Sequence, residues 1–238
     1  MEAIKQRMTD YWTQRVDSFL ALRIKEFEGE KHELWLDELK KYIPMDRKLD
    51  ILDVGTGTGF LALLLASQGH HVTGIDLTPD MIRAAEKMSG QLGIPADFYV
   101  MDGETPDFKE GSFDVIVSRN LTWALPHMDK AYQSWYRLLR KNGVLVNFDG
   151  DYCREKAPMA LPKHHAHSDI APGLMDEYEH LKEALKDGQQ PRPQWDRQLL
   201  ARAGFSQIKV DTSVWYRIYG QMDEFYNPTP IFTIAAYV

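Results

Sequence analysis

Short apolar runs alternate with amphipathic stretches along most of this chain. Apolar residues stand together in runs that begin near Leu49, whereas between these runs they recur every three or four positions. The runs are typical of buried strands, and the second spacing is typical of helices. The alternation therefore predicts an α/β protein with a mostly parallel sheet.

The runs predict seven strands and several helices. The first strand begins near Leu49, and the other strand-like segments are 71–77, 98–104, 112–120, the strand that closes 138–148, 206–214 and 230–238. Helical spacing is found at 4–28, 31–43, 60–67 and 195–203. The segment 149–193 interrupts the alternation and is long for a simple connection. Within it Leu174, Tyr178, Leu181 and Leu185 have helical spacing, which predicts a helix against an apolar surface.

A glycine-rich turn follows the first strand and precedes a helix. Gly55, Gly57 and Gly59 suit a turn in which a ligand approaches the backbone closely. A dinucleotide fingerprint needs its last glycine at position 60, where this chain has Phe60. Asp53 beside the turn would repel a pyrophosphate and attract a ligand with an ammonium or a sulfonium. The turn therefore favours S-adenosylmethionine over a nicotinamide dinucleotide.

With Asp53 to Gly59 the chain resembles the class I S-adenosylmethionine-dependent methyltransferases, in particular the methyltransferase domains of the type 11 group. Two later acids fit that pattern, Asp76 at the end of the second strand and Asp102 in the Asp-Gly-Glu that ends the third. The resemblance implies that Asp76 holds the ribose hydroxyls and that Asp102 faces the adenine amino group. It also implies a Rossmann-like, doubly wound, seven-stranded sheet with an antiparallel last strand, N-terminal helices and an insertion after strand five.

The resemblance predicts a cofactor site for S-adenosyl-L-methionine, with S-adenosyl-L-homocysteine as product. The expected cofactor-binding residues are Asp53, Gly55, Thr56, Gly57, Thr58, Gly59, Asp76, Leu77, Met81, Asp102, Gly103, Glu104, Arg119, Asn120, Tyr11 and Trp12. We expect a single domain, 1–238, made of a helical lid (1–44), the cofactor-binding core (45–148), a substrate-side insertion (149–193) and the rest of the core (194–238). Tyr11 and Trp12 belong to the lid, unless their helix only packs on the domain.

Methyl transfer from a sulfonium is an in-line displacement that needs alignment and exclusion of water more than a particular catalytic residue. His127, just beyond the fourth strand, is a candidate base or else a turn or capping histidine. Trp123 could contact substrate or fill core. The expected substrate-binding residues are Trp123, Asp149, Tyr152 and Tyr226. No metal site is expected, because the fourth strand ends without acids. His164, His165 and His167 could bind a metal or an acidic group, but we interpret them as a solvated cluster.

Charge and cysteine content limit the function classes. With 28 basic and 35 acidic residues the chain carries a formal charge of −7, which argues against a nucleic-acid partner. Cys153 is its only cysteine, and no apolar stretch reaches the length of a membrane span. We expect a cytoplasmic monomer or homodimer that methylates a small molecule on O, N or S. Two alternatives stay open, methylation of a protein or RNA and a non-catalytic S-adenosylmethionine-binding protein.

Overall fold

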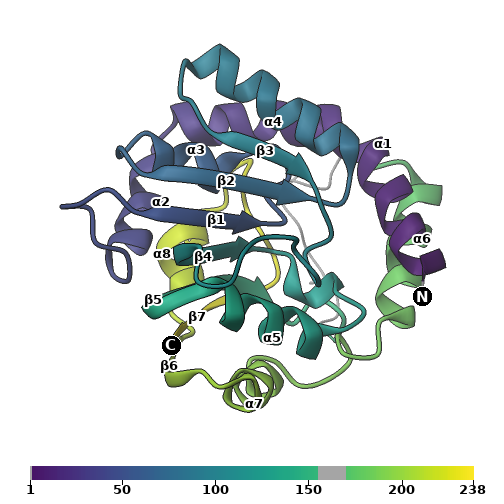
Figure 1. The fold of residues 1–238 in the computed structure, drawn as a ribbon. Helices are drawn as coiled ribbons and strands as arrows, with labels where there is room; N and C mark the ends of the chain where they lie inside the picture. The colour runs from purple at the N-terminus through teal and green to yellow at the C-terminus, as the bar shows by residue number, and fades with distance from the viewer. Residues whose placement is uncertain (1, 155–169) are drawn as a thin grey trace.

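A computed structural model describes residues 2–154 and 170–238 of the chain. Its centre is a seven-stranded sheet in the order β3-β2-β1-β4-β5-β7-β6 (Figure 1). All pairs from β3 to β5 are parallel, and β7 runs antiparallel to both of its neighbours. The strands are β1 Asp50–Val54, β2 His71–Asp76, β3 Asp97–Val100, β4 Phe113–Arg119, β5 Leu139–Gly150, β6 Ser206–Asp211 and β7 Ile231–Tyr237.

Helices cover both faces of the sheet, as the doubly wound expectation requires. The helices are α1 Glu2–Glu28, α2 Lys31–Lys40, α3 Phe60–Ala66, α4 Pro79–Leu92, α5 Met128–Leu138, α6 Pro172–Ala184, α7 Gln194–Ala203 and α8 Val214–Tyr219, with a 3-10 turn, η1, at Thr122–Ala124. Helices α1 to α4 and α8 pack on one face, and α5 and α7 pack on the other. The predicted α/β fold, its antiparallel last strand and its N-terminal helices are confirmed.

Alternation along the strands explains the two apolar cores. Successive side chains of a strand point to opposite faces, so a strand buried on both sides is apolar throughout. In β1, Ile51 joins the core beneath α3, whereas Leu52 joins the core beneath α5. Neighbours in β4 divide in the same way, Val115 to the first core and Ile116 to the second. The polar ends of these strands are therefore what remains to bind a ligand.

Several element boundaries differ from the expectation; the third strand, for example, ends at Val100 rather than at 104. The second helix ends at Lys40 rather than at 43, although Ile43 N–H still donates to Leu39 O over 2.9 Å. Strand β6 ends at Asp211, because the Asp211 carboxylate accepts the Ser213 N–H at 2.8 Å and turns the chain into α8, so Val214 is helical. Helix α4 fills the connection between the second and third strands, to which the sequence patterns assigned no element.

Helix α1 runs from the insertion to the sheet and joins parts that are far apart in sequence. Its first turns lie beside α6 (Figure 1), where the Arg7 guanidinium forms two hydrogen bonds with Glu177, at 2.8 and 3.0 Å. Tyr11 stacks on Tyr178 with ring centroids 5.5 Å apart. Within residues 2–154 and 170–238, no helix has the length and apolar character that crossing a bilayer requires.

Candidate functional site

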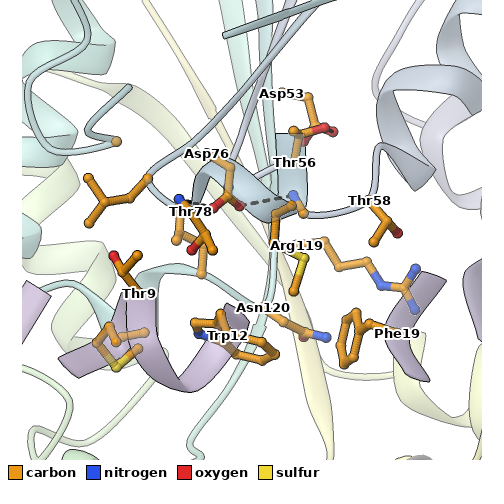
Figure 2. A pocket seen from close by; sticks show the side chains of 18 of the residues that line it. Thr9, Trp12, Phe19, Asp53, Thr56, Thr58, Asp76, Thr78, Arg119 and Asn120 are labelled. Carbon is orange, nitrogen blue, oxygen red and sulfur yellow. Dashed lines mark hydrogen bonds between the residues drawn. The ribbon is translucent and has the colours of Figure 1, made fainter. Parts of the chain in front are cut away.

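A cavity opens at the carboxyl ends of β1, β2 and β4, beneath α1. Figure 2 shows Asp53 and Asp76 on the sheet side and Thr9, Trp12 and Phe19 of α1 opposite them. Of the predicted cofactor residues, the cavity is lined by Trp12, Asp53, Gly55, Thr56, Gly57, Thr58, Asp76, Leu77, Met81, Asp102, Gly103, Arg119 and Asn120. This is the crevice at which open parallel sheets bind ligands.

The glycine turn is shaped by two positions that only glycine occupies easily. Gly55 has φ 69°, and a Cβ there would come within 2.8 Å of the Leu121 side chain. Gly57 has φ 53°, and the space beside its Cα is open. The Gly57 N–H donates to Asp76 Oδ2 at 3.0 Å, which ties the turn to the end of β2. The turn therefore presents bare backbone to the cavity.

Asp53 braces the turn from within. Its Oδ2 accepts the Thr56 hydroxyl at 2.7 Å and the Ala62 N–H at 3.1 Å, so it joins β1 to the first turn of α3. Burial raises the pKa of Asp53 to about 7; the two hydrogen bonds oppose this rise, and the Asp76 charge adds to it. A positive ligand in the cavity would favour the ionised form. Asp53 is thus both a structural brace and a charge that a cation can stabilise.

Asp76 presents a carboxylate to the cavity from the end of β2. Oδ1 accepts the Thr78 N–H at 2.8 Å, and Oδ2 accepts the Gly57 N–H. Burial raises the pKa of Asp76, and the backbone hydrogen bonds oppose the rise. The carboxylate oxygens have further lone pairs, so the group can still accept hydrogen bonds from hydroxyl groups of a ligand. This position and chemistry suit the ribose role that the sequence predicts.

The segment after β3 is fastened by a lysine of α1. Lys5 Nζ lies 2.6 Å from Asp102 Oδ2 and 2.5 Å from Glu104 Oε2. Burial lowers the pKa of Lys5, but hydrogen bonds to the two acids outweigh it and the net shift is upward. Glu104 does not line the cavity, because its other oxygen accepts the His127 N–H at 2.6 Å. Asp102 therefore faces the cavity already paired with α1.

The opposite end of the cavity is built around a buried ion pair. Arg119, at the end of β4, donates to Glu26 Oε1 at 2.9 Å and to the Tyr219 hydroxyl at 2.9 Å. Its guanidinium lies 4.0 Å from the centroid of Trp35. Despite complete burial, the pKa of Glu26 is lowered to about 2 by Arg119 and Arg23. Both arginines line the cavity, so this end is cationic where the other is acidic.

The residues present fit an adenosine ligand that carries both signs of charge. Thr58 Oγ1 is buried at the cavity with no hydrogen-bond partner among the described residues, and a buried hydroxyl without a partner is costly. Asp76 and Asp102 offer acceptors at one end, and Arg23 and Arg119 offer donors at the other. S-adenosylmethionine has ribose hydroxyls, an adenine amino group, an ammonium, a sulfonium and a carboxylate for these partners.

The expected substrate residues lie outside the cavity wall. Trp123 is buried between Tyr152 and Tyr178, with both ring centroids 5.5 Å away. Asp149 is completely buried and accepts the Trp123 N–H at 3.1 Å, so its carboxylate organises the loop after β4. Tyr226 packs on Trp215. Tyr11 also lies outside the wall, within the smaller core between α1 and α6. These side chains shape the surroundings of the cavity, and Tyr152 reaches it through Asn120.

Two candidate histidine sites have different outcomes. His127 is the residue before α5, and its backbone, rather than a side-chain cap, bonds to Glu104. The cluster His164, His165 and His167 lies outside the described residues. Within 2–154 and 170–238, no group of three or more His, Cys, Asp or Glu side chains could hold a metal ion.

Sequence reasoning missed much of the wall that α1 and the loop after β4 supply. Lys5, Met8, Thr9, Phe19 and Arg23 line the cavity from α1, and Leu121, Ala124, Leu125 and Pro126 line it from the loop. Together with Trp12, each of these α1 positions has another three or four residues away or seven away, as on one face of a helix. That spacing was the available signal, but it does not reveal which surface the face covers.

Comparisons with known proteins agree with this geometry. Residues 52–147 match the family model described as a methyltransferase domain. The chain is 33% identical over 114 residues to a phosphatidylethanolamine N-methyltransferase of Cereibacter sphaeroides, covering 46% of this chain and 54% of that protein. It is 27% identical over 191 residues to a ubiquinone/menaquinone biosynthesis C-methyltransferase of Rickettsia bellii, covering 74% and 76%. The chain thus spans about half the length of the first of these relatives.

Solved structures share the fold. A SAM-dependent methyltransferase from Aquifex aeolicus superimposes with a TM-score of 0.58 at 17% identity, covering 90% of this chain and 93% of that one. Phosphoethanolamine N-methyltransferase 2 of Haemonchus contortus, in complex with S-adenosyl-L-methionine, gives 0.59 at 20% identity and covers 85% and 51%. At these identities the likeness concerns the fold alone.

Proposed function

We propose that this chain, whose core is a class I S-adenosylmethionine-dependent methyltransferase domain, transfers the methyl group of that cofactor to an O, N or S atom of a small molecule. The observation that carries the proposal is the cavity end formed by Asp76 and the glycine turn. There a carboxylate and the exposed backbone of the turn meet at the crevice of the sheet. The carboxylate suits the ribose hydroxyls, and the backbone lets the methionine part of the cofactor approach closely.

Each part of the cavity has a role in this reaction. Asp76 would accept the ribose hydroxyls, Asp102 and Gly103 would face the adenine, and Arg119 with Arg23 would attract the carboxylate. The bound cofactor supplies an electrophilic methyl group on a positively charged sulfur. The ionised form of Asp53 stabilises positive charge beside the turn. Helix α1 covers the site and excludes water, which favours an aligned displacement.

Several features support a small acceptor. The cavity is covered by α1, whose first turns are held to α6 by Arg7 and Glu177. A site covered by a helix suits a small molecule better than a polymer. The formal charge of −7 also argues against nucleic acid. Relatives and neighbours are named for phosphatidylethanolamine, phosphoethanolamine and ubiquinone or menaquinone, which sets the first acceptors to try.

Calorimetric titration of the purified chain with S-adenosylmethionine and S-adenosylhomocysteine, with NAD as control, tests the cofactor. We expect micromolar binding of the first two and no heat from NAD. Absence of binding by both would refute the proposal. Turnover is then measured as S-adenosylhomocysteine released with ethanolamine, phosphoethanolamine, amino-acid and quinol acceptors, each compared with a reaction that lacks acceptor.

The two alternatives predict different results in the same assay. A non-catalytic binder would bind S-adenosylmethionine and release no product with any acceptor. An enzyme for protein or RNA would be inactive on the small acceptors and active on cell extract treated to keep only polymers. We propose a cytoplasmic monomer or homodimer, which is consistent with the single cysteine, and fractionation with light scattering tests both points.

A further inference from the structure

Three side chains form a hydrogen-bonded relay that ends at the cavity. The Thr229 N–H donates to Asn227 Oδ1 at 3.1 Å, just before β7. Asn227 Nδ2 donates to the Tyr152 hydroxyl at 2.8 Å, and that hydroxyl donates to Asn120 Oδ1 at 2.8 Å. The relay joins the segments after β4 and β5 to the segment before β7, three neighbouring strands of the sheet.

A backbone amide sets the direction of every bond in the relay. A backbone N–H can only donate, so Asn227 must turn its oxygen toward Thr229 and its NH₂ toward Tyr152. The phenol has one proton, and since it accepts from Asn227 it gives that proton to Asn120. Burial raises the pKa of Tyr152 well above its ordinary value, so the proton is present at all physiological pH values. The carbonyl of Asn120 is thereby occupied and its NH₂ is turned away.

Asn120 is held rigidly where that NH₂ meets the cavity. Its φ is 56°, in the left-handed region that Asn adopts more readily than most residues other than glycine. Its N–H donates to Phe148 O at 2.8 Å, and its carbonyl accepts Trp123 Nε1 at 3.1 Å. Figure 2 shows the end of its side chain directed between Trp12 and Phe19. Among the described residues, Nδ2 of Asn120 has no hydrogen-bond partner.

We propose that the Asn120 amide nitrogen is a fixed hydrogen-bond donor that binds an oxygen atom of the methyl acceptor. The site then selects acceptors that carry a hydroxyl, carbonyl, carboxylate or phosphate oxygen near the methylated atom, because an acceptor without such an oxygen would remove the donor from water and leave it without a partner. Tyr152 and Asn227 are positioning residues that act through Asn120. This inference rests on the proposed function and adds an acceptor class to it.

The cofactor carboxylate is the other oxygen that the donor could meet. Arg23 and Arg119 line the same end of the cavity and offer charged donors, which bind carboxylates more strongly than an amide does. The amide therefore stays available for the acceptor. In the strand order β2-β1-β4-β5, Asp76 ends β2, the glycine turn follows β1 and Asn120 follows β4. The glycine turn therefore lies between Asp76 and Asn120, and an acceptor at Asn120 does not compete with a ligand at Asp76.

Side-chain amide NMR tests the donor directly. The Asn120 NH₂ signals are assigned in ¹⁵N-labelled protein by their loss in Asn120→Asp. Protein saturated with S-adenosylhomocysteine is then titrated with inorganic phosphate, acetate and phenol, and with methylammonium, which has no acceptor atom. We expect at least one oxygen probe to shift the Asn120 signals and methylammonium to leave them unchanged. The same titration is repeated in Tyr152→Phe and Asn227→Asp, with Tyr136→Phe as the matched control outside the relay.

The relay variants separate the proposal from its alternatives. In Asn227→Asp the Tyr152 hydroxyl donates its hydrogen bond to the new carboxylate instead of to Asn120. Asn120 then loses its fixed orientation, and the affinity of the oxygen probe should fall about tenfold. Tyr152→Phe should have the same effect and Tyr136→Phe none.

Shifts caused by S-adenosylhomocysteine alone, with no further change from any oxygen probe, would overturn the proposal and assign the donor to the cofactor. Unchanged probe affinity in both relay variants would also overturn it. Failure of S-adenosylhomocysteine to bind at all refutes the proposed function instead.

Discussion

The two halves of α1 differ in how they are held, although they belong to one helix. Toward its end, Glu26 is fully buried and bonded to Arg119 and to Trp35 Nε1 at 2.8 Å, and Phe27 joins the main core. Toward its start, Lys5 is partly exposed and reaches across the cavity mouth to Asp102. The end of α1 is thus anchored in the main core, whereas its start covers the cavity and packs only in the smaller core shared with α6.

This difference teaches that continuity of a helix does not make its stability uniform. Removing one partner of a buried ion pair lowers the free energy of unfolding by about 3–5 kcal/mol. An exposed pair contributes only roughly 0–1 kcal/mol to that free energy. We therefore predict that the start of α1 opens while the end stays folded. Such opening would admit a ligand without unfolding the domain.

Removing the buried acid should have the largest effect. In Glu26→Ala, Arg119 stays buried without its main partner, and we expect the free energy of unfolding to fall by about 3–5 kcal/mol. Urea denaturation followed by circular dichroism measures this change. Glu26→Gln is the matched control of similar volume, and it should lose less because its amide oxygen can still accept from Trp35.

The same pair predicts how stability depends on pH. The pKa of Glu26 is lowered from 4.5 to about 2, so its contribution is complete above 4.5 and is lost as the pH falls toward 2. The difference in stability between the wild-type chain and Glu26→Gln should shrink over that window. An equal difference at pH 7 and pH 3 would contradict the ion-pair account.

Asp76→Ala should separate binding from stability. The variant loses the acceptors that we assign to the ribose, so the Kd for S-adenosylhomocysteine should rise at least about tenfold, or about 1.4 kcal/mol. Burial raises the pKa of this carboxylate, so its removal relieves a buried charge, and folding loses mainly the hydrogen bonds from the Gly57 and Thr78 N–H groups. Calorimetry measures the affinity and a thermal melt checks the fold. A folded variant with unchanged affinity would refute the ribose assignment.

Asp53 predicts a pH dependence of binding beneath the cover. Because burial raises the pKa of Asp53 from 3.8 to about 7, its carboxyl group in the free protein is protonated below about pH 7. The positively charged cofactor favours the ionised carboxylate. Affinity for S-adenosylmethionine should therefore rise about tenfold from pH 6 to pH 8 and level off above, with proton release on binding. Titration in buffers of different ionisation enthalpy measures the release, and Asp53→Asn should abolish the dependence.

The cavity's sheet side could be predicted from sequence because its contacts are local. Asp53 bonds to Thr56 and Ala62 within nine positions, and Asp76 bonds to Thr78 two positions on. Glycine spacing and strand ends report such contacts directly. Local periodicities predicted the strands and helices, and the family resemblance implied how the strands are arranged in the sheet.

The cover could not be predicted because its contacts are distant in sequence. Lys5 and Asp102 are 97 positions apart, and Arg7 and Glu177 are 170 apart. An amphipathic pattern shows that α1 has an apolar side, but it does not show what that side covers. Asn227 illustrates the same limit, since it stands 75 positions from Tyr152 and nothing in the sequence joins them.

The smallest expected effect tests the cover itself. In hydrogen exchange followed by mass spectrometry, amides of residues 2–13 should exchange through local opening and amides of 19–28 only through global unfolding, because the anchoring pair lies in the second segment. Lys5→Met removes the bonds to Asp102 and Glu104 and keeps an apolar stem. It should speed exchange of the first segment about threefold and cost less stability than Glu26→Ala, since Lys5 is partly exposed and Glu104 still accepts the His127 N–H. Bound S-adenosylhomocysteine should slow that segment in both proteins. Equal protection of the two segments in the free protein would mean that α1 opens as one unit and that its halves do not differ.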